Sequence, residues 1–278
     1  MLLALAFFLV QAAELRRDQE VVITSEKGDQ AHQARRYIES VTEPGFGDPP
    51  LARFSGSVCV ATWGQPQAAG QIVVDRISSI AASLGLRMGE TGCSPNLLVA
   101  FVEDSREAVR QLARGNSGAL KGQTSRDIKR IVAEPGHARS WREVELRGRD
   151  GERPFYSPDQ REPPMMRGTA ISRLSSPIRL EVVSATVFID RSASSGRDLN
   201  QMADYAAMRA LGGVRLRGRV GDASILALFT PDGDKQAPRT LTKFDLGYLK
   251  GLYAGRSDLS GSMKKQSMVS YMLDEKRP

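Results

Sequence analysis

Histidine and cysteine are scarce in this chain of 278 residues, which contains only His32, His137, Cys59 and Cys93. A catalytic zinc site uses three protein ligands, drawn from His, Cys and acidic side chains. Two distant histidines and two cysteines that can pair with each other do not supply such a set, so we expect no metal ion. A Ser-His-Asp triad is disfavoured as well, because the chain has no G-x-S-x-G motif to present the serine.

Glycine-rich motifs that bind phosphates are missing too. The glycine-rich stretches 115–122 and 255–261 do not stand between a strand and a helix, as a phosphate-binding loop or a dinucleotide fingerprint requires. No spacing singles out a pair of catalytic carboxylates either. The sequence therefore predicts no cofactor and leans away from an enzyme.

No apolar run reaches the ~20 residues that a membrane-spanning helix needs. Met1–Ala13 is the most apolar stretch, and Val10-Gln11-Ala12 has the small-residue pattern of a signal-peptidase site. We interpret residues 1–13 as a signal peptide, so that the mature chain has no transmembrane segment. The alternative is a buried N-terminal helix or a misassigned start, because the usual basic residues before the apolar stretch are missing.

The two cysteines lie at matching positions of a predicted β-α-β unit. Ser57–Trp63 and Leu97–Val102 have the composition of strands, and Gln67–Leu84 between them that of an amphipathic helix. Such a unit has parallel strands. Cys59 lies early in the first strand and Cys93 just before the second, so both fall on the same side of the sheet. We expect a disulfide between them in an oxidising compartment; two unrelated thiols are the alternative for a chain that is not exported.

Positive charge is in excess, with 39 Lys and Arg against 32 Asp and Glu, a formal net charge of +7. A basic exported protein attracts anionic envelope components such as lipid phosphates, although solubility alone also explains the excess. Aromatic residues make up 6% of the chain and no recognised nucleic-acid-binding module is present. We therefore do not expect nucleic acid as a partner.

We predict an α/β fold in two halves. Residues 14–56 form a polar lead-in with a short helix, and residues 57–156 form an α/β half with the β-α-β unit. A loop over residues 157–180 then leads to the second half, residues 181–278. The alternative is one continuous domain that includes 57–156 and the second half.

Further strands and helices follow from local patterns. Arg139–Arg147 alternates as a strand does, and the turn after it predicts a hairpin partner near Glu152–Tyr156. In the second half, Val182–Ile189 reads as a buried strand. Asp198–Leu211 reads as an amphipathic helix, which Gly212–Gly213 ends.

The stretch Val182–Tyr253 resembles the second half of a zinc metallopeptidase (zincin) domain. It has a buried strand, a helix ending in Leu-Gly, a D-x-S segment and an L-T-x-x-D-x-x-x-L-x-x-L-Y helix, in that order. A zincin helix carries two histidine ligands and a glutamate base in H-E-x-x-H. Alignment of the Leu-Gly end places Tyr205, Ala206 and Arg209 at those positions. Ala206 has no base and Arg209 is a permanent cation, so the resemblance implies a zincin-like scaffold that has lost its metal.

Three longer stretches, Gly92–Phe101, Asn200–Leu211 and Asp245–Tyr253, are similar to uncharacterised secreted and lipoprotein-like proteins of proteobacteria. The function of that family is not established. This resemblance implies a fold and a bacterial envelope or extracellular location, and no activity.

Polar residues on and after the central helix are the candidates for a binding site. Asp204 and Tyr205 form a polar pair, and the interpretation that we favour is that Tyr205 is a core residue whose hydroxyl is bound to a neighbouring carboxylate. Arg215, Arg217 and Arg219 alternate with other residues, so one face of an extended segment is purely arginine. Such a face can bind phosphate or carboxylate groups, or it can be a solvated edge strand. The full candidate set is Asp204, Tyr205, Arg209, Arg215, Arg217, Arg219 and Asp222.

The sequence thus predicts a periplasmic or secreted bacterial protein that acts as a non-catalytic binding or interaction protein on a degenerate metallopeptidase-like scaffold. The expected partner is an anionic envelope component or another envelope protein. One alternative is a zinc-independent hydrolase that uses the same cleft, with Asp204, Tyr205 or Asp222 in polar roles. The other is a purely structural component of the envelope.

Overall fold

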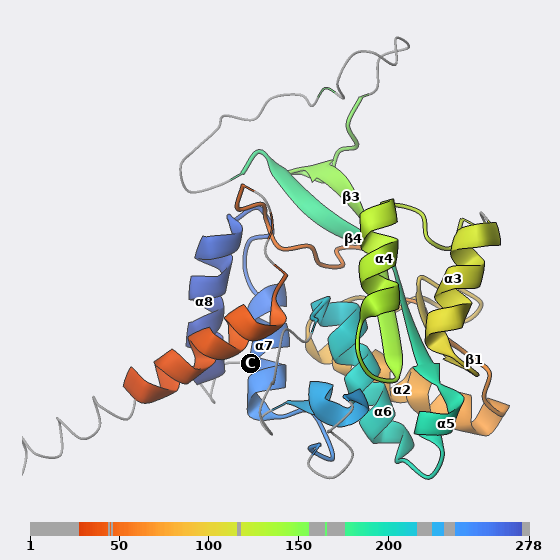
Figure 1. Ribbon diagram of the computed structural model, residues 1–278. Coiled ribbons are helices and arrows are strands. Elements are labelled where there is room, and N and C mark those ends of the chain that lie inside the picture. Colours follow the sequence, from red (N-terminus) through yellow and green to blue (C-terminus); the bar gives the residue numbers. More distant parts are fainter. Residues whose placement is uncertain are drawn as a thin grey trace, which may run out of the picture.

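The structure is a computed structural model that describes residues 28–43, 45, 47–115, 118–155, 165, 176–215, 224–230 and 237–273 (Figure 1). The predicted signal peptide lies outside these residues. Within the described ranges, no helix is both long and apolar enough to cross a membrane.

A four-stranded sheet with strand order β1-β2-β4-β3 forms the centre of the molecule (Figure 1). β1 (Val60–Trp63), β2 (Leu97–Val102) and β4 (Ile178–Asp190) are parallel, and β3 (Ala138–Gly148) pairs with β4 in the antiparallel sense. α2 (Gln67–Ser83) connects β1 to β2. This arrangement confirms the α/β class and the parallel β-α-β unit.

β3 does not form the local hairpin that the sequence predicted. The turn itself exists, because the N–H of Gly151 donates to the carbonyl of Gly148 at 2.9 Å. The partner of β3, however, is β4, in a register that runs from Ala138 opposite Ile189 to Gly148 opposite Ile178. The N–H of Gly148 also donates to the carbonyl of Glu152 at 2.8 Å, but no strand ladder joins β3 to the described residues 152–155, whereas β4, an inner strand with apolar residues on both faces, pairs with β3 along its whole length.

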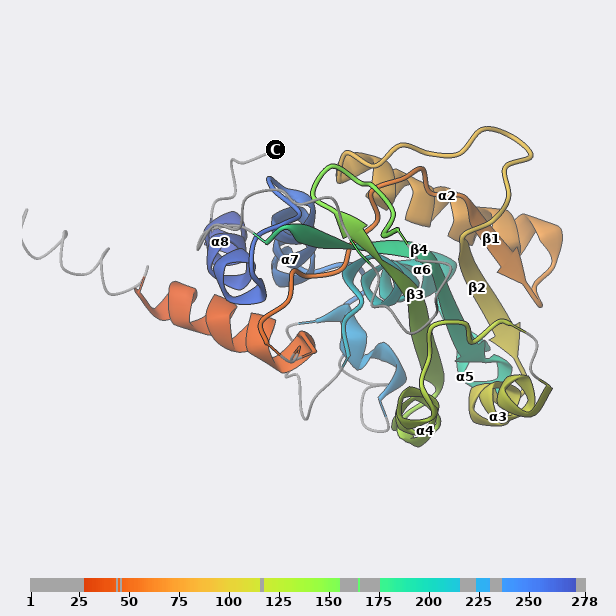
Figure 2. The ribbon, with the colours of Figure 1, turned by 90° about the horizontal axis from the view of Figure 1, so that it is seen from above.

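Helices cover both faces of the sheet (Figure 2). On one face, α3 (Ser105–Gly115) and α4 (Ser125–Ala133) enclose a small apolar core. On the other, α2 and α6 (Leu199–Ala207) contribute to a larger core. Alternate residues of β2 and β4 enter the two cores, as the two-residue period of a strand requires. Further helical elements are a helix over residues 28–41, α5 (Arg191–Ser194), the π-helical turn η1 (Met208–Gly212), the 3₁₀ turn η2 (Ile225–Phe229), α7 (Lys243–Tyr253) and α8 (Gly261–Leu273).

Buried hydrogen bonds attach the helix over residues 28–41 to the second half of the chain. The hydroxyl of Tyr37 donates to Asp245 Oδ1 at 2.6 Å. The same carboxylate accepts from the Ser224 hydroxyl at 2.7 Å and from the N–H of Ile225 at 3.0 Å. Burial and the neighbouring Asp245 raise the pKa of Tyr37 well above its ordinary value, so its hydroxyl keeps the proton that it donates. This helix therefore has a defined place beside α7.

Cys59 and Cys93 form a disulfide, which confirms the pairing that the sequence predicted. Their Cα atoms are 6.1 Å apart. Beside the bridge, the N–H of Cys59 donates to the side chain of Asn96 at 2.8 Å, and the N–H of Leu97 donates to the carbonyl of Cys59 at 3.0 Å. The disulfide thus joins the starts of two neighbouring parallel strands.

Removal of this disulfide in the double variant C59A/C93A should lower the free energy of unfolding by about 3–4 kcal/mol, because the cross-link restricts the unfolded chain. The two cysteines are 34 positions apart, which makes the closed loop a long one. Urea unfolding of the oxidised wild type and of the double variant measures the difference. A loss below about 1 kcal/mol would contradict the expectation and show that the bridge contributes little to stability.

Candidate functional site

The helix at the centre of the second half is present and almost wholly buried. Asp198 caps its start by accepting from the N–H of Gln201 at 2.9 Å, and the π-helical turn η1 extends its end to Gly212. Gly213 then stops it with a left-handed φ of 60°, as the sequence predicted. Turns of this π type are frequent at functional sites. This one carries Arg209 towards β3.

Two of the three residues aligned with the zincin motif lie in a packed core. Tyr205 is 2% exposed and Ala206 is fully buried. The Tyr205 ring meets Phe229 edge to face, with 4.7 Å between the ring centroids. In the part of the chain that the structure describes, no group of three or more His, Cys, Asp or Glu is placed to hold a metal ion.

Arg209, the third of these residues, is a cation that is 1% exposed. Its Nη1 donates to the Tyr205 hydroxyl at 2.7 Å, and its Nε donates to Ser140 Oγ of β3 at 3.0 Å. The Tyr205 hydroxyl therefore accepts from a guanidinium, where the sequence suggested a carboxylate partner.

The charge of Arg209 is balanced by Glu134, which directly follows α4. Nη2 of Arg209 lies 2.7 Å from Glu134 Oε1. The contact is an ion pair with poor alignment, since neither this Nη2 nor Glu134 Oε2 makes a hydrogen bond of good geometry among the described residues. Burial by itself would lower the pKa of Arg209, but Glu134 and Tyr205 outweigh it and raise that pKa. Arg209 is therefore a permanent buried charge.

Asp204 binds structural partners on other elements. Its Oδ1 accepts from Arg76 Nε of α2 at 2.6 Å. Its Oδ2 accepts from Arg76 Nη2 at 3.0 Å, from the Thr240 hydroxyl at 2.7 Å and from the N–H of Leu241 at 2.9 Å. This hydrogen bonding raises the pKa of Arg76. Asp204 thus joins α6 to α2 and to the segment before α7.

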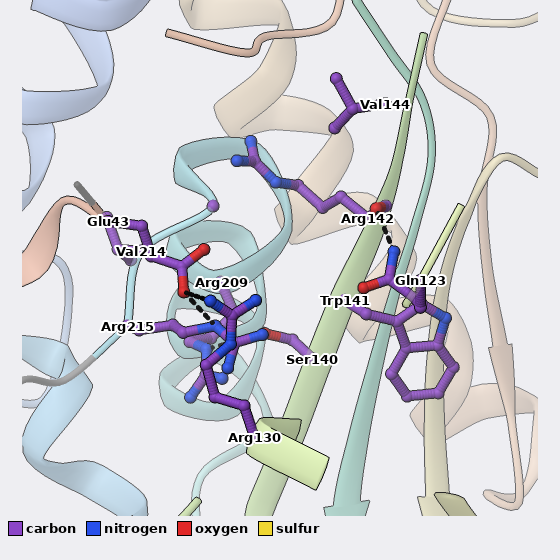
Figure 3. A pocket seen from close by; sticks show the side chains of 11 residues that line it. Glu43, Gln123, Arg130, Ser140, Trp141, Arg142, Val144, Arg209, Val214 and Arg215 are labelled. Carbon is purple, nitrogen blue, oxygen red and sulfur yellow. Dashed lines mark hydrogen bonds and ion pairs between the residues drawn. The ribbon is translucent and has the colours of Figure 1, made fainter. Parts of the chain in front are cut away.

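A pocket lies between β3 and the C-terminal end of the α6–η1 helix (Figure 3). It has a volume of about 100 Å³, smaller than the several hundred Å³ of a site for a drug-sized ligand. Four arginines and one glutamate are its charged lining residues: Arg130, Arg142, Arg209, Arg215 and Glu43. This composition suits a small anionic group.

Glu43 pairs with two of these arginines. Its Oε1 lies 3.0 Å from Arg130 Nη1 and 3.2 Å from Arg215 Nε (Figure 3). Arg130 also pairs with Asp127, one turn earlier on α4, at 2.6 Å. Burial lowers the pKa of Arg215, and Glu43 opposes that effect.

Arg142 of β3 has a different environment. Its Nη1 donates to the carbonyl of Ala52 at 3.2 Å, and no carboxylate within the described residues forms an ion pair with it. Its guanidinium occupies the space beside Gly213, where a Cβ would lie 1.7 Å from Arg142 Cζ. Although the side chain keeps some accessible surface, the protein around it removes enough water to lower the pKa of Arg142. Arg142 is thus a partly desolvated cation held by a backbone carbonyl.

Among the described residues that line the pocket, one arginine consequently has no ion-pair partner. Arg130, Arg209 and Arg215 each have a carboxylate oxygen within 3.2 Å, and Arg142 has none in the described part of the chain. An anion that reached Arg142 would supply a negative counter-charge and accept hydrogen bonds from the guanidinium N–H groups.

The predicted site residues divide into three groups. Arg209 and Arg215 meet at the pocket. Asp204 and Tyr205 are buried and are not among its lining residues. Arg217, Arg219 and Asp222 lie outside the described residues, so their proposed role stays a prediction.

Sequence reasoning missed Glu43, Arg130 and Arg142. A partial signal was present for Arg142, because it lies one position from the buried Trp141 on an alternating strand and so belongs to the opposite face of β3. For Glu43 and Arg130, the neighbouring residues in the sequence give no sign that these side chains meet at a pocket.

A second polar pair was also missed, at the carboxyl ends of the parallel strands. Nδ1 of His137 lies 3.3 Å from Asp190 Oδ2, and Asp190 Oδ1 accepts from the N–H of Ser105 at 2.7 Å. Within the described residues, no hydroxyl or thiol forms a hydrogen bond with His137. The pair therefore has the orientation of a catalytic His–Asp dyad without a nucleophile in contact.

No family model, curated protein or solved structure matches this chain. The resemblance to zincins and to uncharacterised proteobacterial proteins therefore rests on the sequence stretches alone.

Proposed function

We propose that this protein is an exported, non-catalytic binding protein that holds an anionic group, phosphate or carboxylate, in the pocket lined by Arg130, Arg142, Arg209 and Arg215. The bearer of that group is a component of the bacterial envelope. The scaffold is a zincin-like domain in which the metal-binding positions have been replaced.

The uncompensated charge of Arg142 is the observation that carries the proposal. To remove a guanidinium from water without a counter-ion is unfavourable, and the lowered pKa of Arg142 reflects that cost. A carboxylate or phosphate in the pocket would pair with Arg142 and with its exposed neighbour Arg130. The described residues of the pocket therefore leave Arg142 without an ion-pair partner, which is the feature that favours an anion as the ligand.

The disulfide supports the exported location. Cross-links of this kind persist in the periplasm and outside the cell, where thiols are not kept reduced. Cys59 and Cys93 are the only cysteines of the chain, and they are paired with each other. A periplasmic or secreted protein with a net charge of +7 also meets anionic envelope components at raised local concentration.

The order of elements supports the degenerate zincin-like scaffold. β4, the α6–η1 helix, η2 and α7 follow one another along the chain as the resemblance implies. Where a zincin helix would carry its ligands and base, Tyr205 and Ala206 fill the core and Arg209 pairs with Glu134. The replaced residues thus contribute stability and one wall of the anion pocket, in place of metal chemistry.

Titration of the disulfide-intact protein with inorganic phosphate and with acetate tests the proposal. Isothermal titration calorimetry at low ionic strength should detect saturable binding of an anion, weakened about tenfold or more in Arg142→Gln, which removes the unpaired charge. Arg87→Gln is the matched control, because Arg87 is exposed and does not line the pocket. Equal binding by Arg142→Gln and the wild type, with both proteins folded by circular dichroism, would reject the pocket as the site.

A further inference from the structure

Glu43 places its carboxylate between two of the arginines that line the pocket. Among the described residues, it is the only acidic one that lines the pocket. A single oxygen, Oε1, contacts both Arg130 and Arg215 (Figure 3). Arg142, on the opposite wall, forms no ion pair with it. Glu43 therefore neutralises Arg130 and Arg215 and leaves Arg142 without an ion-pair partner.

The backbone next to Glu43 is anchored, whereas its side chain can leave. The carbonyl of Val41 accepts from the N–H of Arg215 at 2.9 Å, and the Thr42 hydroxyl is 3.0 Å from the Tyr248 hydroxyl. The side chains of Glu43 and Arg130 are 37% and 48% exposed. Ion pairs with this much exposure are screened by water and contribute little to stability. Arg215, the other partner of Glu43, is only 13% exposed, so an anion that displaces the Glu43 carboxylate must itself supply Arg215 with a counter-charge.

We propose that Glu43 is a built-in occupant of the pocket that a ligand must displace, and that the displacing group is a phosphate. This inference rests on the function proposed above. A tethered carboxylate acts at high effective concentration, so a free carboxylate of the same charge gains nothing by replacing it. A phosphate monoester carries about −1.5 to −2 charges at neutral pH and has three acceptor oxygens.

The number of acceptor oxygens also favours phosphate over carboxylate. Its additional oxygens and charge provide acceptors for Arg130 and Arg215, as Glu43 does, and leave further acceptors for Arg142, which lines the same pocket and forms no ion pair with Glu43. The volume of about 100 Å³ admits such a group, while the molecule that carries it stays in solvent. The phosphate can belong to a lipid headgroup or to a soluble phosphate ester, because the pocket recognises the group alone.

The test compares Glu43→Gln with Glu90→Gln, which removes the same charge at an exposed position that does not line the pocket. Calorimetric titration with inorganic phosphate, at about pH 8 where the dianion dominates, should show at least about tenfold tighter binding to Glu43→Gln than to the wild type or Glu90→Gln. Acetate should bind measurably only to Glu43→Gln. Addition of Arg142→Gln to Glu43→Gln should remove the gain for phosphate.

Three outcomes separate the possibilities. If phosphate binds the wild type but Glu43→Gln changes its affinity less than about twofold, Glu43 is not the occupant and the inference fails while anion binding stands. If acetate binds the wild type as tightly as phosphate, the assignment to phosphate is wrong. If neither probe binds the wild type or Glu43→Gln, the proposed function itself fails.

Vesicles distinguish the two sources of phosphate. If the phosphate is a lipid headgroup, the protein should co-sediment with vesicles that contain phosphatidic acid and not with vesicles of phosphatidylcholine alone. The bound fraction should then be higher for Glu43→Gln than for the wild type or Glu90→Gln, in the order of their phosphate affinities. Binding of inorganic phosphate in that order without vesicle binding assigns a soluble phosphate ester. Both results support the exchange with Glu43.

Discussion

Replacement of Arg209 by methionine should lower the free energy of unfolding by about 3–5 kcal/mol, because it leaves the carboxylate of Glu134 buried without its partner. The side chains of Arg209 and Glu134 are 1% and 9% exposed, so water cannot replace the lost contact. The hydroxyls of Tyr205 and Ser140 lose a donor in the same change. Chemical unfolding with guanidinium chloride measures the loss.

The double variant Arg209→Met/Glu134→Leu provides the decisive comparison. Replacement of both members of a buried ion pair by apolar residues is often neutral or stabilising, so the double variant should recover most of the stability that the single variant loses. A single variant that loses less than about 1 kcal/mol, or a double variant no more stable than Arg209→Met, would show that Glu134 is not the main partner of Arg209.

Replacement of Asp204 by alanine should also be costly, about 2–4 kcal/mol, because several donors, one of them buried, lose their acceptor. Its two oxygens accept four hydrogen bonds, and one of the donors is the buried N–H of Leu241. Alanine leaves that N–H without an acceptor and separates Arg76 of α2 from α6. Thermal and urea unfolding of the purified variant measure the loss.

Two related variants separate charge from hydrogen bonding at this position. Asp204→Asn keeps an acceptor oxygen and should lose only about 1–3 kcal/mol. Asp75→Ala, at an exposed position of α2, should change stability by less than about 0.5 kcal/mol. A loss for Asp204→Ala as small as that for Asp75→Ala would mean that the contact with Arg76 does not hold α6 to α2.

These two predictions define what the central helix does in this molecule. Asp204 and Arg209 are both candidate site residues from the sequence, and both are bound to structural partners. Arg209 still lines the pocket, so a single residue both stabilises the core and supplies part of the positive wall.

Several features could be predicted from the sequence because they depend on residues close together in the chain. Gly213 ends the central helix as expected, since a left-handed residue after the last turn is a local requirement. The disulfide could also be predicted, although Cys59 and Cys93 are 34 positions apart. A strand-helix-strand pattern implies parallel pairing, and parallel pairing fixes which ends of the strands are neighbours.

The tertiary structure alone decided the partner of β3 and the composition of the pocket. A turn signal after β3 indicates a hairpin, but the free energy of pairing depends on which strand buries β3 best, and that strand begins only at Ile178. Glu43, Arg142 and Arg215 come from three distant parts of the chain and meet only once the sheet and its helices are packed. In the sequence each is one charge among many, because an arginine that will be desolvated looks the same as one that will be solvated. Only the folded surroundings decide whether an arginine is buried or solvated and whether it has an ion-pair partner.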